Sequence, residues 1–210
     1  MATFSQTVTV SANDARFNSN GTYQNGTQVP LGQFGGVSGN LVSYFSPVSI
    51  PRGAVITSAN LSVYVAGTTA TPVLLIGKVG NEANAAMPTT YAACVAAAKT
   101  SGTAYSKNWA SSSGYQTADI TAEVQALVNR ADWVSGNSLV AYLLDNGSAS
   151  GKYATVDMYD MNVSHAPMID ITYTVLSGSG SLPGHAFNNG SGYSGNRRAF
   201  VAGGLNLGGF

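Results

Sequence analysis

The side chains most suited to chemistry are carboxylates and amides that gather near two turns. The segment 157–162, DMYDMN, holds Asp157, Asp160 and Asn162, and an earlier turn holds Asp145 and Asn146. Such oxygen ligands bind calcium, so these residues are calcium candidates, although their spacing does not match an EF-hand loop. Turns at strand ends use the same residue types to accept backbone hydrogen bonds. We favour this structural interpretation and predict no bound metal.

Catalytic chemistry has weaker support in the sequence. Asp157 and Asp160 could serve as the acid and base of glycoside hydrolysis, but the strand pattern does not fix their separation. Serine is abundant, yet no serine lies in a G-x-S-x-G motif of the kind that holds a nucleophile. We therefore predict no catalytic residue, no cofactor and no enzymatic activity.

The histidines and the cysteine are interpreted as structural. His165 precedes an Ala-Pro pair and is expected in a turn, whereas His185 lies in the C-terminal segment. Neither has an acidic residue close enough in sequence to suggest a zinc site. Cys94, within YAACVAAA, is expected to be a buried small apolar residue, and a single cysteine excludes an intrachain disulfide.

Two aromatic residues are candidates for carbohydrate binding. Trp109 and Tyr115 bracket a short polar segment, ASSSG, that is expected to be an exposed loop. Aromatic rings at such a place can stack on sugar faces, but the same rings could instead pack in the core or at an interface. Trp133, which follows a predicted helix, is expected to pack beneath it.

The elements that must position these residues are predominantly strands. Their residues alternate with a period of two and are rich in Val, Ile, Thr and Tyr, with turn-forming segments between them. Two helices are predicted, over 88–102 and over 118–133; in the second, Thr121 is the expected cap, Glu123 lies in the first turn and Arg130 in the last. The predicted strands are 6–12, 40–50, 59–67, 71–79, 137–145, 153–160 and 168–175.

This pattern predicts an all-β protein, a jelly-roll-like antiparallel β-sandwich with one or two short helices. We expect the sandwich domain to span residues 1–175. Residues 176–210 are expected to form an extended, glycine-rich C-terminal arm.

Three blocks of sequence, 42–65, 118–144 and 157–173, resemble the DNRLRE-type β-sandwich domain. The resemblance covers about residues 1–175 and implies a jelly-roll-like fold of cell-surface and secreted proteins, which sometimes act as carbohydrate-binding modules. The FSPVS stretch after Tyr44 departs from the family, in which many members have Arg, Phe and Asp. The matching residues are Ile50, Pro51, Gly53, Ala54, Ile56, Ala59, Leu61, Tyr64, Asp119, Thr121, Val124, Gln125, Val128, Asn129, Gly136, Asn137, Asp157, Ala166, Pro167, Ile169, Ile171 and Tyr173.

Composition limits the partners that we expect. Only 9% of the residues are charged and the formal net charge is zero, against about 25% charged in ordinary soluble proteins. Nucleic acid is not an expected partner, because phosphate binding needs clustered basic residues. No apolar run approaches the roughly 18 residues of a membrane span, and no signal peptide is evident at the N-terminus, so synthesis in a host cytoplasm is expected.

The last 35 residues differ from the rest of the chain, because ten of them are glycine. Large apolar and aromatic side chains are spaced through this segment, as in an arm that docks on neighbouring subunits; a disordered tail is the alternative. The candidate docking residues are Phe187, Tyr193, Arg197, Arg198, Phe200 and Phe210.

Low charge and the glycine-rich arm together predict a structural protein of a bacteriophage virion. We expect a capsid decoration or cement subunit, or a tail-associated subunit, that binds other virion proteins and further copies of itself. Segments 1–12 and 176–210 are expected to be the binding arms. The alternative is a carbohydrate-binding module that adsorbs to glycans; an enzyme acting on polysaccharide is a third and weaker hypothesis.

Overall fold

A computed structural model describes residues 1–68, 73–97 and 113–175, together with the backbone of 106–109. The chain divides into a unit Met1–Ser177 and a unit Gly178–Phe210, and the following description concerns the first. The predicted docking residues of the arm, His185 and the side chain of Trp109 lie outside the described residues.

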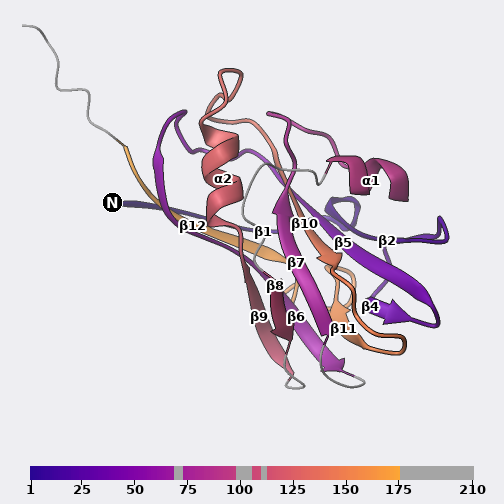
Figure 1. Ribbon diagram of the computed structural model, residues 1–210. Coiled ribbons are helices and arrows are strands. Elements are labelled where there is room, and N and C mark those ends of the chain that lie inside the picture. The colour runs from indigo at the N-terminus through magenta and orange to yellow at the C-terminus, as the bar shows by residue number, and fades with distance from the viewer. Residues whose placement is uncertain (69–72, 98–105, 110–112, 176–210) are drawn as a thin grey trace, which may run out of the picture. The chain divides into compact units, whose positions relative to one another are not determined.

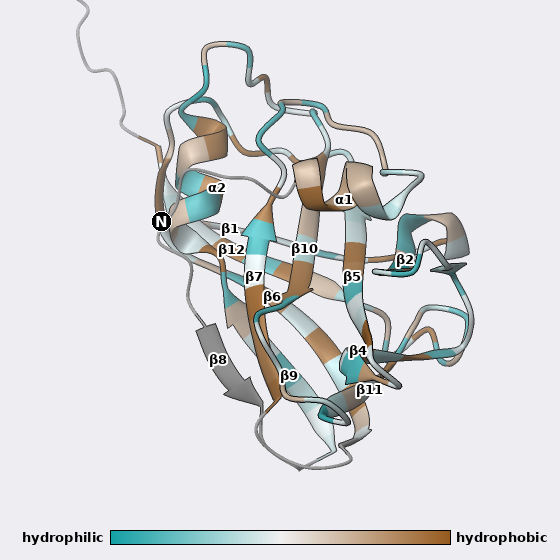
Figure 2. Ribbon diagram, turned by 45° about the vertical axis from the view of Figure 1, so that its right-hand side comes forward, coloured by the Kyte–Doolittle hydropathy of each residue, from teal (hydrophilic) through white to brown (hydrophobic). Residues whose placement is uncertain are grey.

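The described unit is built from twelve antiparallel strands, two short α-helices and one 3-10 turn, which confirms the predicted all-β, jelly-roll-like sandwich. Burial alternates along strands such as β7 and β12, and Figure 2 shows hydrophobic and polar bands along β5. The strands are β1 (Ala2–Thr7), β2 (Asp14–Asn18), β3 (Tyr23–Gln24), β4 (Gln28–Phe34), β5 (Val37–Phe45), β6 (Val55–Thr68), β7 (Val73–Val79), β8 (Ser106–Trp109), β9 (Gly114–Asp119), β10 (Leu139–Asp145), β11 (Tyr153–Asp157) and β12 (Met168–Thr174). The helices are α1 (Tyr91–Ala97) and α2 (Thr121–Val128), and the 3-10 turn is Ser11–Asn13.

The strands form two layers (Figure 1). The first layer contains β1, β12, β6 and β9, extended by β11, which pairs with the end of β6, and by β4. The second layer contains β3, β2, β5, β10, β7 and β8. Hydrogen bonding continues from one layer to the other through β4, which pairs with β11 and then forms a hairpin with β5.

The core lies between the two layers. Residues on the inner face of β6, such as Val63, are buried in one cluster with inner-face residues of the second layer, such as Phe45 and Leu143. Because successive residues of a strand point to opposite faces, the period-two pattern places these side chains together. Full burial of each such side chain stabilises the fold by roughly 1.5–3 kcal/mol.

The two helices have different positions on the sandwich. In the view of Figure 1, both lie near the upper end of the strands, on either side of β7 and β10. Helix α2 packs on β6 and β7, one strand from each layer, and its apolar residues Val124 and Leu127 enter the core. Helix α1 covers the outer face of the second layer, where Cys94 joins a separate buried cluster with Phe17 and Tyr142.

Side-chain amides and hydroxyls fasten α2 to the start of β6. The Gln125 side chain accepts a hydrogen bond from the Ile56 amide at 2.8 Å and donates one to the Ala54 carbonyl at 2.9 Å. Thr121 Oγ1 accepts a bond from the Ala59 amide at 2.9 Å. The Trp133 ring is buried as expected, and its Nε1 donates to the Ile50 carbonyl at 2.9 Å.

The predicted boundaries were wrong where polar residues form strands. Residues 114–119 form β9, and α2 begins only at Thr121, so this threonine is not the cap. Instead, Asp119 Oδ1 accepts a bond from the Thr121 amide. The helix ends at Val128, before Arg130, which pairs with Asp132 at 2.7 Å.

Several strands were missed, and the first predicted binding arm includes a strand of the sandwich itself. Residues 2–7 form β1 and pair in register with β12 of the same sheet. Strand β4 contains Pro30 and Gly32, which are unusual within strands. Glycine is required at position 32, where φ is +96° and a Cβ atom would lie 2.7 Å from the Lys152 carbonyl oxygen.

The attachment of α2 gives a first prediction. Replacing Gln125 with Ala removes the partners of the Ile56 amide and the Ala54 carbonyl, and should lower the free energy of unfolding by about 2 kcal/mol. The matched variant is Asn129→Ala, which loses only an exposed bond to Gln125 and should cost under about 0.5 kcal/mol. Urea denaturation measures both; equal losses would contradict this account of the helix.

Candidate functional site

A histidine–carboxylate pair lies where β11 ends and β12 is about to begin. Asp157 is buried at the end of β11, and His165 is in the turn before β12. Asp157 Oδ2 lies 2.7 Å from His165 Nδ1, and Asp157 Oδ1 accepts a bond from Gln28 at 2.8 Å. Because a carboxylate accepts hydrogen bonds, this contact places the hydrogen on Nδ1 and leaves Nε2 for another partner.

Aromatic rings continue from this histidine across the outer face of the first layer. The His165 ring is stacked on Tyr64, with centroids 3.5 Å apart and planes at 4°. Tyr64 meets Tyr115 of β9 edge to face at 5.5 Å. We call Tyr115, Tyr64 and His165 the aromatic row.

Tyr115, one of the two predicted glycan candidates, lies at the open end of this row. Its side chain is 41% exposed, and its hydroxyl donates to the Ser164 carbonyl at 2.6 Å. Partial burial and the nearby Asp157 raise the pKa of the Tyr115 hydroxyl above its ordinary value. A half-exposed ring that is fixed by a hydrogen bond offers a flat apolar face to a ligand.

The expectation that the histidines have no acidic partner was wrong for His165. From the sequence alone, Asp157 is a calcium candidate and His165 a separate turn residue. The pairing arises because the turn between β11 and β12 folds back over Tyr64. The separation of eight residues across a turn rich in Asp and Asn was the only sequence signal for it.

The predicted calcium candidates have separate hydrogen-bond partners. Asp160 Oδ2 accepts a bond from Ser11 Oγ at 2.5 Å, and Asn162 Oδ1 accepts bonds from Ser164. Asp145, near the other turn, accepts bonds from Gln33, Ser38 and Ser148. Within the described ranges, no three His, Cys, Asp or Glu side chains gather in a group that could hold a metal ion. The bonds from Ser148 to Asp145 and from Ser164 to Asn162 are local turn bonds, whereas those from Ser11, Gln33 and Ser38 join distant segments.

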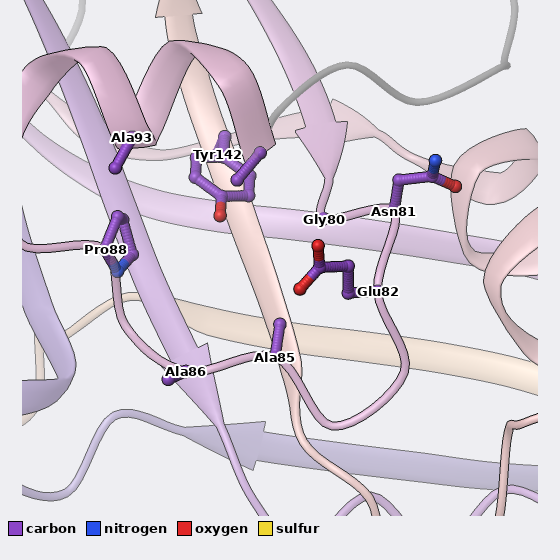
Figure 3. A pocket seen from close by; sticks show the side chains of 9 residues that line it. Gly80, Asn81, Glu82, Ala85, Ala86, Pro88, Ala93 and Tyr142 are labelled. Atoms are coloured by element: carbon purple, nitrogen blue, oxygen red, sulfur yellow. The ribbon is translucent and has the colours of Figure 1, made fainter.

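A small pocket lies between α1 and the loop that follows β7 (Figure 3). Its volume is about 220 Å³, and the Tyr142 ring lies beneath the helix with its hydroxyl pointing toward the loop that carries Ala85 and Ala86. Burial raises the pKa of Tyr142 and raises that of Cys94 to about 12. The Cys94 thiol therefore stays protonated at neutral pH, in agreement with its predicted role as a buried small residue.

A second pocket, of about 320 Å³, lies beside the β2–β3 and β4–β5 hairpins. This pocket is not evident in the sequence, because β2 is too polar to be recognised there as a strand. We call it the Arg16 pocket, after the buried arginine in its wall. Its lining consists of Arg16, Asn18, Asn20, Thr22, Gln24, Phe34, Gly35 and Val37.

Strand β2 also places Asp14 in the interior. Asp14 is fully buried, and its Oδ2 accepts a bond from the Tyr159 amide at 2.8 Å. Burial raises the pKa of this carboxyl to about 6, and the negative charge of Asp160 adds to the effect, whereas the bond from Tyr159 opposes it. Asp14 is therefore a group that changes charge near neutral pH.

Comparison with known proteins adds no relatives, because no family model and no curated protein matches this chain. The resemblance to the DNRLRE-type domain therefore stays a prediction. Among the described residues, no helix is long and apolar enough to cross a membrane.

Asp14 gives a second prediction. Its pKa is about 6 in the folded protein against 3.8 as an ordinary carboxyl, so the folded state binds the extra proton between these values. The contribution of Asp14 to the free energy of unfolding is therefore highest below about pH 4, and it falls by about 3 kcal/mol as the pH rises past 6. Asp14→Asn should remove this loss, so the free energy of unfolding of the variant, relative to that of the native protein, should increase from pH 4 to pH 7. Urea denaturation at both pH values measures the difference, and a constant difference would show that Asp14 is not the group responsible.

Proposed function

We propose that this chain is a non-enzymatic structural subunit of a bacteriophage virion, in the capsid shell or the tail. In this proposal it binds neighbouring subunits, including further copies of itself, through the edge of its sandwich and through the segment 176–210. The observation that carries the proposal is a strand edge without charged residues on a protein that is poor in charge throughout.

The edge in question belongs to β1. This strand ends the hydrogen-bonding order, and β12 is its one partner among the described strands. Its sequence, ATFSQT, contains no charged residue and no proline. Isolated proteins usually protect such edges with lysine, proline or a covering segment, because an open edge pairs with other chains. An unprotected edge suits a subunit whose edge is covered in an assembly.

The charge distribution supports the same proposal. No charged residue lies between Arg16 and Arg52, or between Asp170 and Arg197. A free monomer relies on surface charge to stay in solution, whereas a subunit surrounded by neighbours does not. The spaced aromatic residues of 176–210 would supply apolar anchors for such neighbours.

A third prediction concerns the C-terminal segment. A variant lacking residues 176–210 should keep the sandwich, because the cores described above lie within residues 1–175. It should nevertheless fail to bind particles that the full chain decorates. Sedimentation of the added protein with purified particles lacking it measures binding, and circular dichroism verifies the fold.

A matched variant separates loss of the segment from loss of chain length. Replacing Phe187, Tyr193, Phe200 and Phe210 with Ser keeps all residues but removes the aromatic anchors, and it should bind as poorly as the deletion. Normal decoration by the truncated protein would contradict the proposed role of the segment.

The second candidate function is glycan binding by the aromatic row. The specific observation in its favour is the exposed, edge-supported ring of Tyr115, whose neighbour Tyr64 is itself stacked on His165. Rings fixed in this way can stack on a sugar without losing much side-chain entropy. The two functions are compatible, since a virion subunit can also adsorb to glycans.

A fourth prediction tests this candidate. On an array of neutral glycans, Tyr115→Ala should weaken binding to a recognised glycan at least about tenfold, which corresponds to about 1.4 kcal/mol. Tyr115→Phe keeps the ring, loses only the bond to Ser164, and should retain most of the binding. Unchanged binding by the alanine variant would exclude the aromatic row as the glycan site.

A further inference from the structure

The Arg16 pocket contains a buried cation without a counter-ion. Arg16 is only 3% exposed, and none of the ion pairs in the described part of the chain involves it. Its Nη1 donates to Gln24 Oε1 at 2.6 Å, whereas Nε and Nη2 have no hydrogen-bond partner among the described residues. An uncompensated charge in the interior is strongly unfavourable, and an arriving anion would relieve that cost.

Glycine at position 39 makes room for the guanidinium. A Cβ atom at Gly39 of β5 would lie 2.4 Å from Arg16 Nε and 2.6 Å from Nη2. The guanidinium is therefore packed directly against the β5 backbone, which fixes its orientation. Because its position is fixed, binding an anion would require little reorganisation of the arginine itself.

The rest of the lining is uncharged and suits a sugar. Asn18, Asn20 and Thr22 offer amide and hydroxyl groups, and Phe34 offers a ring that is 48% exposed. The Phe34 ring is supported edge to face by Tyr153, with centroids 4.8 Å apart. Pockets that combine an apolar ring with a few fixed polar groups bind small ligands in a defined orientation.

We propose that the Arg16 pocket binds a saccharide that carries one negatively charged oxyanion on each sugar unit, either a carboxylate or a phosphodiester. The oxyanion accepts hydrogen bonds from Nη1, in place of Gln24 Oε1, and from the unpartnered Nη2. The sugar ring stacks on Phe34, and Asn18 and Asn20 bond its hydroxyl groups. A single negative charge matches the one guanidinium, whose planar donors suit both oxyanions. The choice of a sugar as the ligand rests on the second proposed function, glycan binding, but the Arg16 pocket is separate from the aromatic row.

The test is isothermal titration calorimetry with the full chain and three defined probes. These are a trigalacturonate, a short oligomer of galactose units joined by phosphodiesters, and neutral galactotriose. At least one anionic probe should bind about tenfold or more tightly than galactotriose, because a hydrogen-bonded charge contributes more than a neutral group. Its affinity should fall as salt is raised from 50 to 500 mM. Preference between the two anionic probes identifies the oxyanion.

Three variants locate the site. Arg16→Lys keeps the charge but loses the planar donors, and should weaken the preferred probe about tenfold or more. Phe34→Ala changes only an exposed ring, so it should fold normally and also weaken binding. Tyr115→Ala, on the aromatic row, should leave binding to the anionic probe unchanged.

The contradicting results are distinct for each proposal. Equal affinity for the neutral and anionic probes, or unchanged binding by Phe34→Ala, would overturn the Arg16 pocket as an anionic-sugar site. Loss of binding in Tyr115→Ala alone would show that the sugar binds at the aromatic row and not in the Arg16 pocket. Glycan binding by this protein would then still be supported. Absence of binding to all three probes would overturn the inference, while particle decoration would test the virion role independently.

Discussion

The structure depends on the packing of two apolar sheet faces against each other. Every strand of the two layers must direct alternate side chains inward, so that residues such as Val63 and Phe45 meet in the core. This arrangement is interrupted along β2, where the inward positions hold Asp14, Arg16 and Asn18. The polar residues of β2, together with the buried Ser43 of β5, are thus set into a mainly apolar interior. Their burial raises the pKa of the Asp14 carboxyl to about 6 and lowers that of Arg16 to about 10.

The two outer faces of the sandwich differ in what covers them. The second layer is covered by α1, whose Cys94 packs in a cluster with Tyr142, and the pocket beside this helix is small, with four alanines in its lining. The first layer presents the aromatic row, and β1 at its edge has no charged residue. The features suited to binding are therefore on the first layer and in the Arg16 pocket. Edge pairing with neighbouring subunits and sugar binding would use different parts of the same domain.

The sequence predicted the fold through the alternation of its strongest strands. Strands such as β7 and β12 are rich in large apolar residues, their burial alternates from residue to residue, and both were placed within a few residues of their observed bounds. Strands β2 and β9 were missed because they are polar and short, and their strand conformation depends on pairing with β5 and β6. The same pairing explains why the helix predicted from residue 118 begins at Thr121.

The candidate sites were less predictable because they depend on contacts between distant segments. Tyr115 was selected from its own surroundings, but its neighbours Tyr64 and His165 come from β6 and from the turn before β12. Arg16 was overlooked, since only the fold reveals that its charge is buried and that Gly39 makes room for it. Single residues with suitable chemistry can be recognised in a sequence, whereas a site needs the register of the strands.

The central claim is that this sandwich is a subunit of a particle, and a cryo-electron microscopy reconstruction of the purified virion tests it most directly. The account predicts density for the sandwich at symmetry-related positions, with the outer edge of β1 or the segment 176–210 against a neighbouring subunit. Absence of the chain from particles that contain the rest of the virion proteins would contradict the claim.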